Sequence, residues 1–160
     1  MPWSELTESL GATTFEVVLC VGNSLGHAEG PSARVAALTA MAGLLSPGGH
    51  LVLHSRNWEQ VCAAGSRFEV SDRVVRRRDC DAVVIYCWEI RDHWEQEHNL
   101  QIAVSQIATD GSVATTSERL SFWPYQYEQL LKELESVGLK LSASTFDPDA
   151  DGYVVVADRQ

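Results

Sequence analysis

The feature that most constrains the fold of this chain is a pair of short apolar runs separated by a helical segment. The runs are Phe15–Val21 (FEVVLCV) and His50–Ser55 (HLVLHS). Both are short and rich in branched apolar residues, which predicts strands buried on both faces. Between them, Pro31–Leu45 repeats apolar residues at helical spacing. Such a unit predicts two parallel strands joined by a right-handed crossover.

The segment Ser46–Gly49 (SPGG) is expected to end this helix, because proline cannot continue a helix and glycine permits a positive φ. Polar residues then follow both predicted strands. The first strand leads into Gly22–His27, and the second leads into Ser55–Trp58. Since ligands of parallel sheets bind beyond the carboxyl ends of the strands, these two stretches predict a binding site.

Further along the chain, the pattern changes to strands joined by polar turns. The predicted strands are Arg73–Arg78, Ala82–Arg91, Gln101–Ala108 and Ser112–Trp123. Asp110-Gly111 predicts a hairpin turn between the last two. Together they indicate an antiparallel β insertion over residues 68–123 of a single domain that spans residues 1–160.

The final part of the chain predicts one helix and one hairpin. Pro124–Val137 has an amphipathic pattern, and Gly138 is its expected cap. Leu141–Phe146 and Tyr153–Ala157 predict two strands around a polar turn. The expected fold class is therefore α/β.

Composition narrows the class of partner. The formal net charge is −10, which argues against nucleic acid because phosphate binding needs clustered basic residues. The one basic run, Arg76–Arg78, is interpreted as a solvated strand or turn. No apolar stretch approaches the roughly 20 residues that span a bilayer, and the N-terminus lacks the pattern of a signal peptide. The cysteines form no C-x-x-C pair, so we expect buried free thiols in a reducing cytoplasm.

Three motifs carry a resemblance to a known family. CVGNSLGH, HSRNWEQVCAAG and ERLSFWPY are similar to segments of the glycine and glycine/sarcosine N-methyltransferases. The order of elements also resembles the second half of a class I S-adenosylmethionine (SAM)-dependent methyltransferase. The resemblance covers nearly all of this chain and only the rear part of the family's chains. It implies a Rossmann-like sheet from the fourth strand onward, SAM as cofactor, and a small amine or amino acid such as glycine as substrate.

The resemblance also implies roles for particular residues. Arg56 matches an arginine that grips the substrate carboxylate, and Asn23 matches an asparagine beside the amine and the methyl group. Both are candidate catalytic residues. The implied cofactor-binding residues are Trp3, Val21, Gly22, Ser24 and His27. A guanidinium fork suits a carboxylate, and the asparagine carbonyl could orient an amine.

Each of these residues also has a plain structural interpretation. Arg56 could be a surface ion-pair partner. Asn23 and Ser24 could be turn residues, and His27 could cap a helix or stay solvated. Trp3 could belong to a frayed terminus.

The chain contains no G-x-G, the turn that such methyltransferases place against SAM. We therefore expect a truncated domain whose first strand, Phe15–Val21, is an open edge. Two hypotheses follow. The chain is an enzyme that is incomplete alone, as a homo-oligomer or paired with a chain that supplies the front half. Alternatively, it is a non-catalytic remnant that binds a partner through this edge.

Two acidic segments contain residue types that can bind a metal ion. Asp147–Gly152 resembles the start of a calcium loop but has Asp158 at the twelfth position, so a polar turn is expected. His93, Glu95 and Glu97 alternate as on one strand face, where a solvent-facing strand is the commoner case. No metal site is predicted.

Overall fold

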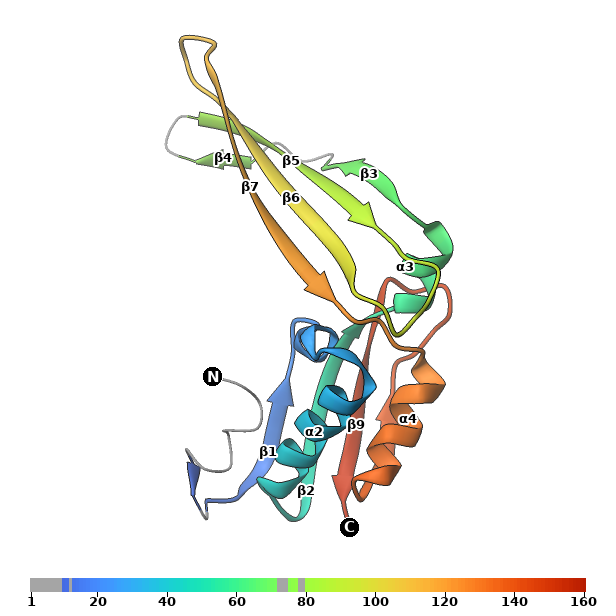
Figure 1. Cartoon of the computed structure of the whole chain (residues 1–160). Helices are drawn as coiled ribbons and strands as arrows, with labels where there is room; N and C mark the ends of the chain where they lie inside the picture. The colour runs from blue at the N-terminus through green and yellow to red at the C-terminus, as the bar shows by residue number, and fades with distance from the viewer. Residues whose placement is uncertain (1–9, 12, 72–74, 78–79) are drawn as a thin grey trace.

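The computed structural model describes residues 10–11, 13–71, 75–77 and 80–160, which form two β-sheets joined end to end (Figure 1). The first sheet contains β1 (Phe15–Cys20), β2 (Leu45–Arg56), β8 (Leu139–Ser144) and β9 (Gly152–Arg159). The second contains β3 (Arg67–Val70), β4 (Val75–Arg77), β5 (Cys80–Glu89), β6 (His98–Ile107) and β7 (Val113–Phe122). The helical segments are η2 (Ser24–His27), α2 (Gly30–Gly43), α3 (Trp58–Ala64) and α4 (Tyr127–Ser136).

The first sheet has the order β1-β2-β9-β8. β1 and β2 are parallel and α2 connects them, so the predicted strand–helix–strand unit is confirmed. β9 runs antiparallel to both of its neighbours, and β8 and β9 form the predicted hairpin. Within the described residues β1 is an edge strand, as expected from the sequence.

The predicted end of the first long helix is wrong by a few residues. α2 ends at Gly43 with Leu44 as its cap, and Ser46–Gly49 belongs to β2. There the register against β1 jumps, because Phe15 pairs with Leu45 whereas Val17 pairs with His50. Gly49 makes this bulge possible, since a Cβ at that position would lie 2.9 Å from the Ser46 carbonyl oxygen. Proline is tolerated in such a bulge.

The two faces of the first sheet differ in cover. α2 and α4 lie over the same face (Figure 1), which buries Leu51 and Leu53 of β2 and Val155 and Ala157 of β9. On β1 the alternate residues point the other way, and Leu19 is 64% exposed. The prediction that Phe15–Val21 is buried on both faces is therefore wrong for the described part of the chain. An apolar run cannot reveal whether a second layer is there to cover it.

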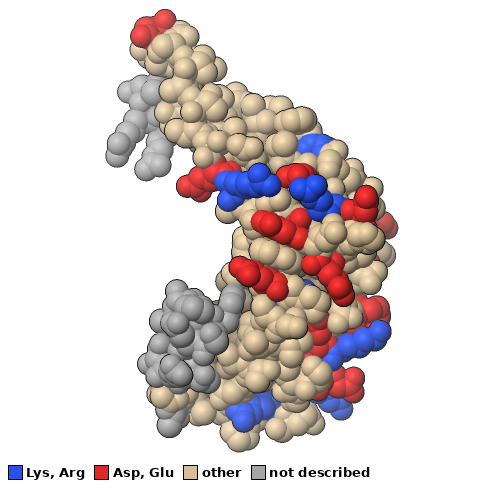
Figure 2. Space-filling model, viewed as in Figure 1, with Lys and Arg blue, Asp and Glu red and all other residues tan. Residues whose placement is uncertain are grey.

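The second sheet rises beyond the carboxyl ends of β1 and β2 (Figure 1). β5, β6 and β7 are antiparallel neighbours, and β3 and β4 both pair with β5. The predicted turn is confirmed, because Gly111 N–H donates to the Ala108 carbonyl and the Asp110 carboxylate accepts from Ser112 N–H. Figure 2 shows charged side chains gathered near the middle of the molecule and a hollowed side between the two sheets.

Two interpretations of the sequence near this sheet need correction. Residues 91–97 form a loop between β5 and β6, so His93, Glu95 and Glu97 do not share a strand face. The sequence pattern also missed α3 and β3, which are only seven and four residues long. Short elements of this kind carry too few residues for a period to show.

A buried ion pair joins the two helices on the covered face. The Arg34 guanidinium donates to both carboxylate oxygens of Glu133 at 2.6 and 2.7 Å, and both side chains are buried. Arg34 also lies 4.8 Å from the centre of the Tyr125 ring. Both residues lie at core-facing positions of their helices. They are 99 residues apart in the sequence, and their ion pair links α2 to α4.

The acidic segment Asp147–Gly152 is a turn held by one buried asparagine. The Asn57 side-chain amide donates to the carbonyls of Asp147, Pro148 and Ala150 at 3.0–3.3 Å, and its backbone N–H donates to the carbonyl of Asp151. Asn57 thus holds this segment as a hydrogen-bonded turn, which is the structure expected from the sequence. No helix of the described residues is long and apolar enough to span a membrane.

Candidate functional site

The loop after β1 has a strained backbone that the end of β2 supports. Gly22 and Asn23 have φ of 71° and 65°, and Asn23 is the one described non-glycine residue with a positive φ. Asparagine tolerates this left-handed conformation because its short side chain bonds locally. Here its backbone N–H donates to the His54 carbonyl at 3.2 Å, and its Oδ1 accepts from Arg56 N–H at 3.2 Å. Strain that the surroundings hold in place is typical of functional loops.

Arg56, the second predicted catalytic residue, ends β2 directly beside this loop. Its side chain is exposed, and its guanidinium lies 5.2 Å from the centre of the Trp88 ring of β5. Among the described residues no carboxylate comes within ion-pair distance of it. Four other arginines do have such a partner, namely Arg34, Arg67, Arg91 and Arg119. Arg56 is therefore a positioned cation that can accept an anion.

The site includes three residues that the sequence analysis did not select, namely His54, Asp151 and Gly152. Gly22, Asn23, His54, Arg56, Asp151 and Gly152 line a hollow of about 390 Å³. His54 accepts a 3.3 Å hydrogen bond from Gly22 N–H through Nδ1. Asp151 arrives from the turn before β9, because Gly152 pairs with Arg56 in the sheet register. Only the pairing of β2 with β9 brings Asp151 here, whereas His54 was visible as a polar residue at the end of a predicted strand.

The predicted cofactor-binding residues fall into different places. Val21 is half exposed at the end of β1, and its carbonyl accepts from the Ser24 hydroxyl at 2.7 Å. Ser24 therefore stabilises the turn. His27 points away to the second sheet, where Nδ1 donates to the Ser121 carbonyl at 2.8 Å and the ring packs 4.5 Å from Phe122. Trp3 lies outside the described residues.

The space below the loop is tightly packed. Gly26 leaves little room for a side chain there, since a Cβ would lie 3.0 Å from the Trp58 ring and 3.2 Å from the Asn23 amide. Burial raises the pKa of the Cys20 thiol to about 11, and a backbone hydrogen bond from Leu25 opposes this weakly. The thiol therefore stays protonated and is a packing residue rather than a nucleophile.

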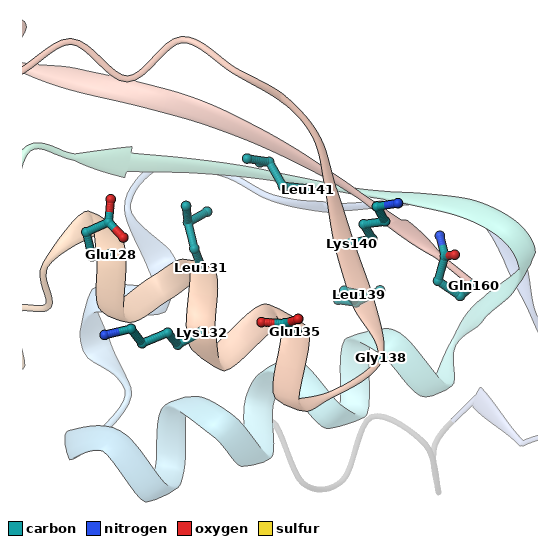
Figure 3. A pocket seen from close by; sticks show the side chains of 9 residues that line it. All are labelled: Glu128, Leu131, Lys132, Glu135, Gly138, Leu139, Lys140, Leu141 and Gln160. Atoms are coloured by element: carbon teal, nitrogen blue, oxygen red, sulfur yellow. The ribbon is translucent and has the colours of Figure 1, made fainter.

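Two larger hollows lie elsewhere in the described part of the chain. One of about 590 Å³ lies between α4 and β8 at the far edge of the sheet (Figure 3). Its walls are Glu128, Leu131, Lys132, Glu135, Gly138, Leu139, Lys140, Leu141 and Gln160. The other, of about 630 Å³, lies between α3 and the loop after β5, where Glu59 and His98 already serve in structural hydrogen bonds. Neither contains a predicted site residue. No group of three or more His, Cys, Asp or Glu among the described residues could hold a metal ion.

The geometry fits one side of a cofactor site. The strained loop and the end of β2 form a wall at the carboxyl edge of the sheet, which is where parallel sheets bind ligands. The outer edge of β1 is open within the described residues, so the described part offers no opposite wall. On the wall that is present, Arg56 can hold an anion, and the second lone pair of Asn23 Oδ1 can accept from an amine.

The chain matches no protein-family model, and no curated protein sequence matches it. Solved structures do resemble it. DesVI of Streptomyces venezuelae has a TM-score of 0.75 at 18% identity, covering 94% of this chain and 61% of that one. KedS8, a sugar N-methyltransferase from a Streptoalloteichus species, has a TM-score of 0.73 at 20% identity, covering 94% and 58%. CalS10, a SAM-bound amino pentose methyltransferase of Micromonospora echinaspora, has a TM-score of 0.72 at 17% identity, covering 92% and 59%.

At these identities the likeness shows the fold. The chain spans about three fifths of the length of each of these structures. The predicted α/β class, a Rossmann-like sheet with an antiparallel β insertion, is confirmed.

Proposed function

We propose that this chain is the rear, substrate-binding part of a SAM-dependent N-methyltransferase that acts on a small amine bearing an anionic group. Glycine is the simplest such amine, and the sequence resemblance favours it. The observation that carries the proposal is the Arg56 guanidinium, which stands beside Asn23 without a carboxylate partner among the described residues. The neighbouring sugar N-methyltransferase structures also support a small amine as substrate.

The chemistry asks little of the protein beyond alignment. SAM supplies a methyl group on a sulfonium, and the amine nitrogen attacks it in line. A neutral amine already has the lone pair that forms the new bond, so no general base is required. Arg56 would hold the anionic end by a bidentate fork, and Asn23 Oδ1 would accept from the amine N–H. Fixing both ends of a small molecule supplies the orientation on which such a displacement depends.

The cofactor site needs a second wall, and the open edge of β1 indicates where it belongs. Cys20 at the end of β1 is buried, whereas Val17 and Leu19 of the same strand are exposed. An apolar edge strand with unpaired backbone groups favours pairing with another strand. We infer that a second copy, or a chain carrying a glycine-rich turn, completes the site. The free thiols of Cys20, Cys62 and Cys87 are consistent with a cytoplasmic location.

Calorimetric titration of the purified chain with SAM and with S-adenosylhomocysteine tests the cofactor. Saturable micromolar binding, followed by methyl transfer to glycine, is expected if the chain completes its own site. Arg56→Met should then raise the KM for glycine by about tenfold to a hundredfold, from the loss of a charged hydrogen-bonded pair. Arg91→Met is the matched control, because Arg91 is exposed and paired with Glu89. Equal effects of the two variants would refute the role of Arg56.

A second function is favoured by the exposed apolar edge itself. A non-catalytic methyltransferase remnant would keep the fold and bind a partner through β1. This alternative predicts no SAM binding even at millimolar ligand, together with a stable complex at the β1 edge.

A further inference from the structure

We propose that Trp88 is a positioning residue for the substrate anion: its indole, fixed by Glu69 and Arg67 of β3, holds the Arg56 guanidinium in the orientation that receives a carboxylate. This inference rests on the proposed role of Arg56. It assigns part of the substrate specificity to the second sheet, none of whose residues the sequence analysis selected as a site residue.

Arg56 and Trp88 make a contact between the two sheets. Arg56 ends β2 in the first sheet, and Trp88 belongs to β5 in the second. The guanidinium carbon lies 5.2 Å from the indole centre, within cation–π range. Trp88 is only 4% exposed, so its ring is a fixed surface. A long flexible side chain that lies on such a surface loses much of its freedom before any ligand arrives.

Hydrogen bonds support the indole from behind. Trp88 Nε1–H donates to Glu69 Oε2 at 3.2 Å, and Arg67 Nε–H donates to Glu69 Oε1 at 2.5 Å. Arg67 in turn donates to the carbonyls of Val61 and Gly65. The ring plane is therefore set by a chain of hydrogen bonds that ends in the backbone after α3.

Glu69 also affects the charge balance around Arg56. Glu69 accepts hydrogen bonds from Arg67 and Trp88, and among the described residues its ion pair is with Arg67 and not with Arg56. Glu69 still lies close enough to Arg56 for their charges to interact. The pKa of Glu69 is lowered mainly by its Arg67 hydrogen bond and in smaller part by the charges of Arg67 and Arg56. An acceptor on the indole N–H also makes the ring a better partner for a cation. Glu69 thereby strengthens the surface under Arg56 and leaves the guanidinium fork free.

The test reads the orientation of Arg56 directly. In ¹H–¹⁵N spectra, the Arg56 Nε–H signal is identified by its loss in Arg56→Lys. We expect the indole ring current to shift this signal upfield in the unmodified chain. Trp88→Leu should return it to the position of a free arginine and weaken glycine binding about two- to fivefold, the size of one exposed cation–π contact. Trp88→Phe should restore both in part, because it keeps a ring face and loses the N–H.

Trp94→Leu is the matched control, since Trp94 is a partly buried tryptophan of the following loop. It should leave the Arg56 signal in place. If Trp88→Leu does not fold, Glu69→Gln carries the test. Glu69 is 46% exposed, and Gln offers one acceptor where two donors now bind, so the Arg56 signal should still move.

If the chemical shift of the Arg56 Nε–H signal is unchanged in both Trp88→Leu and Glu69→Gln, the proposal is overturned. A signal that moves as expected while glycine shifts nothing in any variant would support the positioning of Arg56. That second result would instead refute glycine as a ligand of this chain by itself.

Discussion

The two faces of the β1-β2-β9-β8 sheet each carry an apolar row and have different surroundings. On the covered face, Cys20, Leu53 and Val155 form one row across three strands, and all are buried beneath α2 and α4. On the opposite face, Leu19, Val52 and Val156 form the neighbouring row, and Leu19 is 64% exposed. Both rows are apolar, as expected for strands designed to be covered twice.

This comparison locates the functional question. The covered face explains the stability of the chain, because its helices and the Arg34–Glu133 pair close it completely. The other face and the β1 edge border the site at Gly22, Asn23 and Arg56. An exposed apolar surface next to the candidate site is one that a further layer of protein would cover. Four experiments test the contrast between the two faces.

The largest effect is expected from the ion pair on the covered face. Glu133→Ala leaves the buried Arg34 guanidinium without its carboxylate, which should reduce the free energy of unfolding by about 3–5 kcal/mol. Urea denaturation followed by circular dichroism measures this. Glu89→Ala is the control, because Glu89 pairs with Arg91 and Arg119 at the surface, where about 0–1 kcal/mol is expected. Similar losses in the two variants would show that the Arg34–Glu133 pair is not buried in solution.

A matched pair of truncations compares the two rows directly. Leu53→Ala should cost about 2–5 kcal/mol in unfolding free energy, because it opens a cavity under α2. Val52→Ala, one residue along the same strand, should cost less than about 1 kcal/mol because its side chain already meets solvent. A large loss for Val52→Ala would mean that the second face is covered after all.

Tyr153 on the covered face predicts an alkaline effect. Burial raises the pKa of Tyr153 from 10.0 to about 12. An unfolded chain releases this proton near pH 10, so the contribution to stability is complete below pH 10 and declines as the pH rises to 12. Tyr153→Phe should flatten this decline, as measured by urea midpoints across that range. At pH 7 it should be nearly neutral, because the hydroxyl has no hydrogen-bond partner within the described residues. An unchanged slope would contradict the burial of Tyr153.

The smallest effect on stability, and the most informative for function, is expected at the edge. Leu19→Lys should change the unfolding free energy by less than about 0.5 kcal/mol, since the side chain is exposed. It should nonetheless disrupt self-association, because a charged edge opposes strand pairing. Size exclusion with light scattering at micromolar concentration measures both proteins. A clean monomer of the unmodified chain would refute the homo-oligomer and leave the separate partner chain.

Much of the first sheet and part of the site could be predicted from local patterns. The apolar runs around α2 predicted the parallel pair. The rule that ligands bind at strand ends pointed to Gly22–His27 and Ser55–Trp58, and the family resemblance selected Asn23 and Arg56 within these stretches. Asp110-Gly111 predicted its turn. These features depend on residues close together in the sequence, where spacing and backbone preference act directly. The roles of Asn23 and Arg56 in catalysis, and those of Val21, Gly22, Ser24, His27 and Trp3 in cofactor binding, stay predictions.

Other features depend on contacts that no local pattern contains. Asp151 enters the site because β9 pairs with β2. In the sequence, Glu133 is one of several polar residues of an amphipathic helix, so its burial could not be predicted. Its ion pair with Arg34, which lies 99 residues away in the sequence, makes the burial possible.

The sequence by itself determined the alternation of strands and helices, the position of the main turns and the polar residues that follow each strand. These follow from backbone sterics and from the periodicity of apolar residues. The tertiary structure alone decided which face of the sheet is covered, that Arg56 has no carboxylate partner among the described residues, and that the Trp88 ring lies beside it. The physical reason is that burial and charge pairing are properties of surfaces in contact, and those surfaces exist only once the strands have found their neighbours.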